Sequence, residues 1–211
     1  MRKTTLTLAD AFIVSIICFG LFIVWSVDAV ASGFPEARFS DSSHTWLLLV
    51  EVVLAAAALL YLHARQFDIT SLYPHPSLGG SGLGVGLFLL AWVLGAIVMA
   101  LVASPEKRQI VEFSYTGLSL LTTVLVGMVN GTYEEVFLLG VLARGLRGFG
   151  LSVAIGLSLL VRVLYHMYQG PLGMVWVLVV GATLTVSYVW SRKLWPPVFA
   201  HMLWDIVPVL L

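Results

Sequence analysis

The sequence predicts an all-α fold, a polytopic membrane helix bundle of about seven transmembrane helices in a single integral membrane domain, residues 1–211. Of the 211 residues, 60% are hydrophobic and only 10% are charged, whereas soluble domains carry about 25% charged residues. The mean hydropathy is +1.00. Long apolar runs also recur along the chain, and a helix of about 20 apolar residues crosses a bilayer core about 30 Å thick.

Seven apolar runs have the length of membrane helices. In lipid every backbone polar group must be hydrogen-bonded within the protein, and the runs are too long for barrel strands, so we expect helices. In chain order the runs cover residues 11–27, 46–62, 83–103, 113–143, 149–168, 172–191 and 194–211. Little of the chain remains for a soluble domain.

Four of these runs carry almost no charge. Residues 11–27, 83–103 and 172–191 have none, and residues 46–62 have only Glu51. Because Glu51 lies close to the start of its run, we expect it at the membrane interface, where it can reach water. The fourth, fifth and seventh runs differ, since each contains ionisable residues well inside the apolar stretch.

The linkers between the runs are short. The linker 63–82 ends in the glycine run Gly79-Gly80-Ser81-Gly82. Glycines can cradle a phosphate, but neither a lysine nor a strand pattern accompanies this run. We therefore expect a flexible lead into the third helix, with small residues that permit close packing.

The charge balance and the cysteine count exclude several classes of protein. Eleven basic and eleven acidic residues give a formal net charge of zero, whereas a nucleic-acid binder needs a basic excess. The single cysteine, Cys18, excludes an intrachain disulfide and a cysteine-based metal cluster. We expect the lipid bilayer as a partner and no nucleic acid.

The distribution of basic residues predicts a cytoplasmic N-terminus. With the N-terminus inside, seven basic residues fall in inside segments and three in outside segments, as the positive-inside rule requires. The inside set is Arg2, Lys3, Arg65, Arg144, Arg147, Arg192 and Lys193, and the outside set is Arg38, Lys107 and Arg108. A cleavable signal sequence over residues 1–31 is the alternative, because a basic start and Ala29-Val30-Ala31 flank the first run. The length of that run and Trp25 favour an uncleaved anchor.

Six ionisable residues lie where a membrane helix should be apolar. They form three local pairs, Glu134 and Glu135, Arg162 and His166, and His201 and Asp205. Ionisable groups at such positions are costly and usually functional. The last two pairs are spaced i, i+4, so each pair shares one helix face. Carboxylates and imidazoles that converge from three helices suit acid–base chemistry. Ion pairs that only lock the packing are the alternative, but they leave the two histidines unexplained.

Three motifs around these residues resemble those of a known family. Residues 134–140, Glu-Glu-Val-Phe-Leu-Leu-Gly, are similar to the motif EExxxRG. Residues 162–166 are similar to FxxxH, and residues 201–205 match HxxxN or HxxxD. In these motifs the chain resembles the CAAX protease and bacteriocin-processing family, also called Abi, which includes the CAAX prenyl proteases.

The resemblance covers residues 113–211 and implies that they form a catalytic core, with residues 1–112 supplying three helices and their loops. It implies an intramembrane endopeptidase of the bacterial plasma membrane that needs no cofactor. The implied partner is a peptide or a membrane-protein substrate.

The resemblance also implies a role for each motif residue. Glu134 and His166 would hold a water molecule and remove its proton as it attacks the scissile carbonyl. His201 would donate a hydrogen bond to the resulting oxyanion. Asp205 would accept from the other ring nitrogen of His201 and orient it.

Two positions depart from the family motifs, and both concern an arginine. Leu139 stands where the first motif has arginine, and Arg162 stands where the second motif has phenylalanine. Glu135 buried without a cation would destabilise the bundle. We therefore expect Glu135 and Arg162 to support the site as a pair, with Arg162 supplying the charge that the family places at Leu139.

Three alternatives stay open. Two histidines and a glutamate can hold Zn²⁺, although the zinc signature His-Glu-x-x-His is absent. A small proton-coupled transporter would use the same buried acids, although the sequence has neither an internal repeat nor paired broken helices. A non-catalytic adaptor or bacteriocin-immunity protein is modestly favoured by the leucine at position 139.

Overall fold

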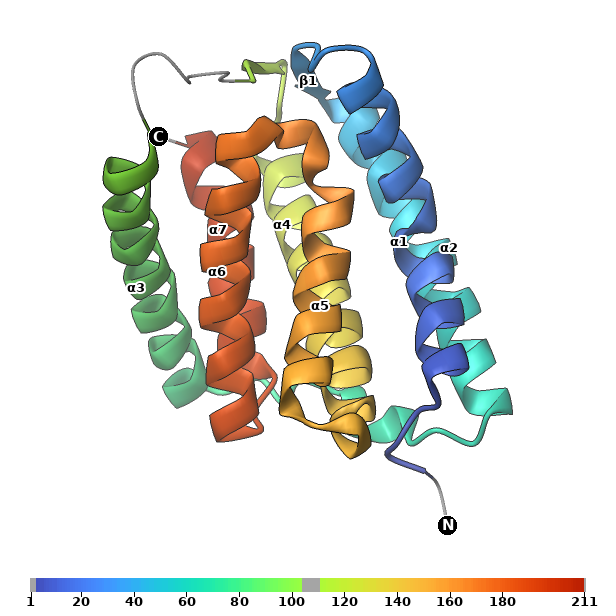
Figure 1. The fold of residues 1–211 in the computed structure, drawn as a ribbon. Coiled ribbons are helices and arrows are strands. Elements are labelled where there is room, and N and C mark those ends of the chain that lie inside the picture. Colours follow the sequence, from blue (N-terminus) through green and yellow to red (C-terminus); the bar gives the residue numbers. More distant parts are fainter. Residues whose placement is uncertain (1–2, 104–110, 211) are drawn as a thin grey trace.

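The computed structural model describes residues 3–103 and 111–210 and shows a bundle of helices (Figure 1). The prediction of an all-α helix bundle is confirmed. Within the described residues the α-helices are α1 Leu8–Ala31, α2 Asp41–Ala64, α3 Leu78–Val102, α4 Leu120–Glu135, α5 Leu151–Tyr165, α6 Gly170–Ser191 and α7 Trp195–Leu210. Three basic residues on which the orientation was predicted lie outside the described residues, namely Arg2, Lys107 and Arg108.

Five helices of the described chain are long and apolar enough to cross a membrane. They are Leu8–Ala31, Asp41–Ala64, Leu78–Val102, Leu120–Ala143 and Met167–Ser191. The helices α5 and α7 have 15 and 16 residues, fewer than the about 20 that a perpendicular span needs. The number of seven transmembrane helices therefore stays a prediction.

The ends of α1 and α2 near the N-terminus are held together by one carboxylate. Thr7 caps α1, because its hydroxyl accepts a hydrogen bond of 3.0 Å from the backbone N–H of Asp10. The Asp10 carboxylate accepts in turn from the Tyr61 hydroxyl at 2.7 Å and from Arg65 Nε at 2.8 Å. The two helices can therefore form one wall of the bundle.

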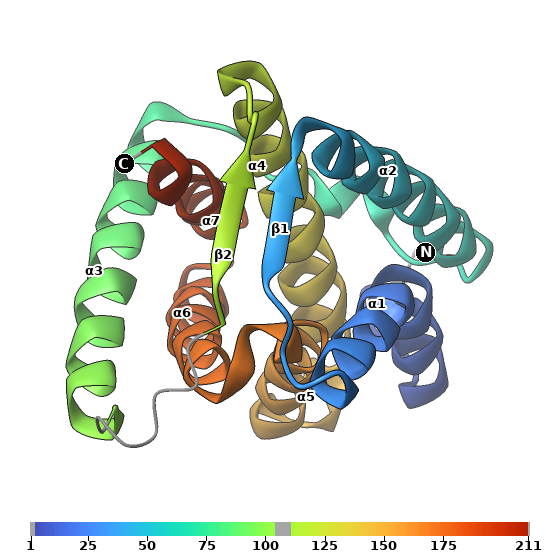
Figure 2. The same ribbon diagram turned by 90° about the horizontal axis from the view of Figure 1, so that it is seen from above.

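Two short strands cross the other end of the bundle, which the sequence did not predict. β1 Ala37–Ser40 pairs with β2 Phe113–Thr116 in parallel, and both lie over the helix ends when the molecule is seen from above (Figure 2). The expected helical run 113–143 is therefore wrong at its start. Gly117, with φ of 64°, turns the chain after β2, and the Ser119 hydroxyl caps α4 at the Thr122 backbone N–H.

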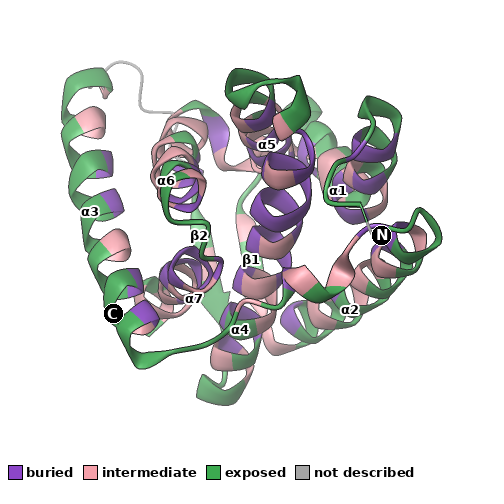
Figure 3. Ribbon diagram, turned by 90° about the horizontal axis from the view of Figure 1, so that it is seen from below, coloured by how far each residue is buried: buried purple, intermediate pink, exposed green. Residues whose placement is uncertain are grey.

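The helix α4 and its continuation lie in the middle of the bundle. α4 packs against α2 and α7, and the π-helical segment Val136–Ala143 that follows it packs against α5. Residues 137–143 of this segment are all buried. Much of the outer helices α2 and α3 is instead exposed (Figure 3). Their exposed apolar side chains include Val53, Leu60 and Leu101. Such faces suit contact with lipid.

Candidate active site

Glu134 and Glu135 end α4 where the helix changes type. The next residues form a π-helix, whose i→i+5 hydrogen bonds widen the turn and are common at functional sites. Both side chains are buried, with 5% and 0% of their surface exposed. The bundle must therefore satisfy two carboxyl groups with its own polar atoms.

Glu135 joins three elements through one oxygen. Its Oε1 accepts from Arg162 Nη2 of α5 at 2.6 Å and from His201 Nδ1 of α7 at 2.5 Å. The expected contact between Arg162 and Glu135 is therefore present. Because the His201 ring donates through Nδ1, its Nε2 is left for other partners.

Glu134 lies beside the same two groups. Its Oε2 is 3.6 Å from Arg162 Nη1 and 3.7 Å from His201 Nε2. The Tyr165 hydroxyl also donates to Oε2. Tyr165 was not among the residues predicted from the sequence, because a tyrosine in an apolar helix carries no distinctive signal. The three neighbours hold the carboxylate of Glu134 in one position.

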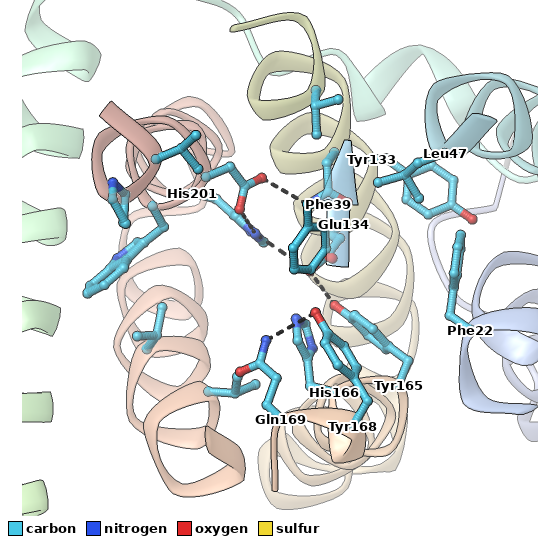
Figure 4. A pocket seen from close by; sticks show the side chains of 18 of the residues that line it. Phe22, Phe39, Leu47, Tyr133, Glu134, Tyr165, His166, Tyr168, Gln169 and His201 are labelled. Carbon is cyan, nitrogen blue, oxygen red and sulfur yellow. Dashed lines mark hydrogen bonds and ion pairs between the residues drawn. The ribbon is translucent and has the colours of Figure 1, made fainter. Parts of the chain in front are cut away.

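His166 comes directly after α5 and lines the same cavity as Glu134 and His201 (Figure 4). Its Nδ1 lies 3.0 Å from the carbonyl oxygen of Arg162. A carbonyl oxygen can only accept, so Nδ1 carries the proton and Nε2 is an acceptor. In the described structure His166 forms no hydrogen bond with Glu134, so the water that the two were expected to share stays a prediction.

The expected bond between Asp205 and His201 is not formed. Asp205 Oδ1 lies 3.7 Å from His201 Nε2, which is too long for a hydrogen bond. Asp205 Oδ2 instead accepts from Asn130 Nδ2 of α4 at 2.8 Å. Glu135 therefore orients His201 in place of Asp205, and Asn130 is a further polar residue that the sequence did not single out.

The first helix, α1, contacts two tyrosines that lie next to Glu134. The Tyr133 hydroxyl donates to the carbonyl oxygen of Cys18 at 2.6 Å. The Ser26 hydroxyl donates to the carbonyl oxygen of Tyr165, also at 2.6 Å. The ring of Phe19 stacks on that of Tyr165, with centroids 4.8 Å apart. α1 thus positions Tyr133, which precedes Glu134 in the chain, and Tyr165, which donates to the Glu134 carboxylate.

These groups line a cavity of about 570 Å³. Aromatic rings form much of its wall, including Phe22, Trp92, Trp176 and Trp204. At the end where the strands lie, Phe39, Phe113 and Tyr115 also line it. The cavity therefore offers a largely apolar volume with a polar cluster in its wall, as binding sites for organic ligands usually do.

Glu51 is a second polar group of this cavity, and its expected interfacial position is wrong. Its side chain is 1% exposed and lines the cavity. α2 begins at Asp41 and is capped by Ser40, so the helix starts earlier than the apolar run suggests and places Glu51 deeper. Its Oε2 is buried without a hydrogen-bond partner among the described residues.

Leu139 does not face the cluster of charges. It is fully buried and packs with Ala143, Tyr188 and Leu194. At residue 139, where the family motif has arginine, both the side chain and the groups that surround it are therefore apolar.

A metal ion fits the polar cluster poorly. Among the described residues, ligand atoms of Glu134, Glu135 and His201 lie within 4.8 Å of one another. The zinc alternative required both histidines, and His166 is not part of this group. Glu135 Oε1 already accepts two short hydrogen bonds, and the Arg162 guanidinium lies beside both carboxylates. A divalent cation would have to displace these donors and face a fixed positive charge.

One comparison with known proteins gives a match. Residues 116–207 match the protein-family model described as "Type II CAAX prenyl endopeptidase Rce1-like". The matched segment contains all six residues predicted for the site. No curated protein and no solved structure matches the chain.

Proposed function

Because residues 116–207 match the model of the type II CAAX prenyl endopeptidase Rce1-like family, we propose that this protein is an integral membrane protease that cleaves peptide bonds with a water molecule activated by Glu134. The observation that carries the proposal is the position of Glu134. Its carboxylate is held in the wall of the cavity beside Arg162, His201 and Tyr165. His166 lines the same cavity.

Glu134 acts as the general base in this proposal. Tyr165 donates to Oε2, so Oε1 is the oxygen that would take a proton from the attacking water. His166 Nε2 is an acceptor and would hold the second hydrogen of that water. As the water oxygen attacks the scissile carbonyl carbon, Glu134 takes the proton, and it later gives the proton to the leaving amine.

His201 would stabilise the oxyanion of the tetrahedral intermediate. Its Nδ1 already donates to Glu135, so donation by Nε2 requires a doubly protonated ring, whose positive charge the nearby carboxylates of Glu134, Glu135 and Asp205 would balance. A charged donor in a site that excludes water stabilises developing negative charge more than it would in solution. Asn130, held by Asp205, offers a second N–H beside it.

The walls of the cavity favour a substrate with a large apolar group near the scissile bond. Aromatic side chains from α1, α3, α6 and α7 supply contact area of the kind that recognises such groups. A prenyl chain on a peptide has this character, and so has an apolar peptide segment. We propose that the substrate is a peptide or a membrane protein that carries one of these two apolar groups.

Cleavage of labelled peptides by the purified protein tests the proposed function. We expect a peptide with an apolar or prenylated C-terminal segment to be cut, and Glu134→Gln to reduce the rate at least about 100-fold. Asp28→Asn is a matched control, because it also removes one carboxylate but lies at the exposed end of α1. Peptide binding without cleavage by the folded wild-type protein would contradict the proposal and favour the adaptor instead.

A further inference from the structure

A second cavity, of about 630 Å³, lies at the end of the bundle away from the strands. Four basic side chains line it, and they come from two parts of the chain, Arg144 and Arg147 after the π-helix and Arg192 and Lys193 after α6. None of the described residues that line it is acidic. The cavity therefore gathers positive charge that its own walls do not neutralise.

The two arginines after the π-helix are held by neutral groups. Arg144 donates to the hydroxyl and the carbonyl oxygen of Ser71. Arg147 Nη2 donates to the carbonyl oxygen of Val189 at 3.0 Å, whereas its Nε is buried without a partner among the described residues. None of the four basic residues pairs with a described carboxylate. The positions of Arg144 and Arg147 are thus set by neutral groups, while all four charges remain available to an anion.

The start of α3 adds backbone donors to this charge. The glycine run predicted to be a flexible lead is instead part of α3, which begins at Leu78 and is capped by Ser77. Ser77 Oγ accepts from the backbone N–H of Gly80 at 3.1 Å. The N–H groups of Leu78 and Gly79 lie in the first turn of the helix, so they have no acceptor within the helix. Positive potential at a helix N-terminus favours an anion.

Close packing keeps the helix start beside the basic residues. Trp195 Nε1 donates to Ser81 Oγ at 2.9 Å. A Cβ atom on Gly80 would lie 2.6 Å from the Trp195 ring, so glycine is needed at this position for α3 to approach α7. The sequence places no lysine beside the glycine run. In the folded protein, basic residues from far along the chain lie there instead.

We propose that this cavity binds a phosphate monoester or diester, of which the headgroup of an anionic phospholipid is the favoured source. Leu83 also lines the cavity and is 59% exposed. It lies on α3, one of the helices apolar enough to span the membrane. An apolar flank next to the basic end of such helices matches the boundary at which a lipid carries its phosphate.

Arg192 allows a test that does not disturb the fold. Its φ is 60°, a conformation that glycine adopts without strain. Arg192→Gly therefore removes a charge while the backbone keeps its shape, and Lys193→Gln removes the exposed neighbouring charge. Arg38→Gln, at the other end of the bundle, removes one cation away from the cavity and is the matched control.

Thermal unfolding in lipid nanodiscs measures the binding. We expect phosphatidylglycerol, added stepwise to phosphatidylcholine, to raise the melting temperature of the wild-type protein and of Arg38→Gln. In the Arg192→Gly/Lys193→Gln variant the phosphatidylglycerol fraction needed for half the effect should rise about fivefold for each charge removed. Equal melting temperatures of all three proteins in pure phosphatidylcholine would show that the variants fold.

Inorganic phosphate, titrated into the detergent-solubilised protein at constant ionic strength, distinguishes the two sources. Stabilisation by phosphate in detergent, lost in the double variant, with no response to phosphatidylglycerol would assign the site to a soluble phosphate ligand. A response to phosphatidylglycerol that the double variant lacks would assign it to lipid. If neither probe stabilises the wild-type protein, or if the double variant responds as the wild type does, the proposed site is refuted.

Discussion

Glu134 and Glu135 are neighbours in the chain, yet their surroundings differ. Glu135 is fully buried and holds Arg162 and His201 through one oxygen, whereas Glu134 borders the cavity. We expect Glu135→Gln to lower the free energy of unfolding by about 3 kcal/mol, because it leaves a buried guanidinium without its carboxylate. Glu134→Gln should leave the melting temperature close to that of the wild type.

Thermal unfolding and peptide cleavage of both variants check this assignment. The two should separate, since Glu134→Gln should lose activity alone, and Glu135→Gln should lose stability as well. Equal melting temperatures with equal losses of activity would mean that the carboxylates share one role.

Arg162 is the cation on which both carboxylates depend. Its two terminal nitrogens lie 2.6 Å from Glu135 and 3.6 Å from Glu134. We expect Arg162→Leu to destabilise the protein by about 3–5 kcal/mol, because it leaves buried negative charge without a partner. Arg162→Lys should recover part of this loss, since lysine keeps the charge but has only one nitrogen, which cannot contact both carboxylates as the two terminal nitrogens of arginine do. Chemical denaturation of the three proteins gives the comparison.

The surroundings of Leu139 decide whether an arginine can be moved back to the family position. Leu139 packs with Ala143, Tyr188 and Leu194, so Leu139→Arg would place a charge among apolar groups. We expect Arg162→Leu/Leu139→Arg to be no more stable than Arg162→Leu. Recovery of stability or activity in this double variant would show that the π-helix can turn residue 139 toward Glu135.

At the level of single residues, the sequence predicted the titratable groups better than their partners. A glutamate or histidine inside an apolar run is conspicuous because burying it is costly, and Glu134, Glu135, Arg162 and His201 do meet. Burying a tyrosine or an asparagine costs less than burying a charge, so Tyr165 and Asn130 do not stand out in the sequence. Their hydrogen bonds to Glu134 and Asp205 can be recognised only once α5 and α7 are placed against α4.

Glycines on α4 set the distance between α4 and α7. A Cβ atom on Gly131 would lie 2.9 Å from the backbone nitrogen of Met202, next to His201 on α7. We expect Gly131→Ala to push α7 outward, to cost about 1–3 kcal/mol through overpacking, and to reduce cleavage by moving His201 away from Glu135. Spaced four apart, Gly127 and Gly131 form the small-residue pattern that brings membrane helices together.

Gly156 on α5 provides the control for this prediction. A Cβ atom there would meet nothing within 4 Å, so Gly156→Ala should leave activity unchanged and should not lower stability. If the two alanine variants have the same activity and melting temperature, the close contact between α4 and α7 does not position His201.

The elements were predicted more accurately than their ends. Apolar runs located all seven α-helices of the described chain, because exclusion of water from the bilayer determines which stretches become helical. The short strands could not be foreseen. Each has four residues, and pairing between segments so far apart in the chain leaves no local pattern. The end of α5 was also missed, because the turn Met167–Gln169 begins inside the apolar run 149–168.

The two cavities of the molecule lie toward opposite ends of the helix bundle. The cavity with the glutamates reaches the strands, and the basic cavity lies at the end where the N-terminus lies. We propose that the protein lies in the bacterial plasma membrane with its N-terminus in the cytoplasm. The basic cavity would then face the cytoplasm, and substrate would reach Glu134 from the opposite side.

Labelling of introduced cysteines tests this orientation. We expect Arg38→Cys, in β1, to react with a membrane-impermeant maleimide on intact cells, and Lys193→Cys to react only after the cells are opened. The native Cys18 is fully buried, so it should contribute little background, and the unmutated protein measures that background. The reverse labelling pattern would place the active site on the cytoplasmic side.

The candidate active site needs both the first helix and the last. α1 supplies the carbonyl oxygen that accepts from Tyr133 and the hydroxyl that donates to Tyr165, while α7 supplies His201. A chain still emerging from the ribosome therefore carries Glu134 and His166 before it carries His201. Under the proposed function, the nascent protein would gain activity only once α7 is in place, so the order of synthesis would delay cleavage as a removable pro-segment does in other proteases.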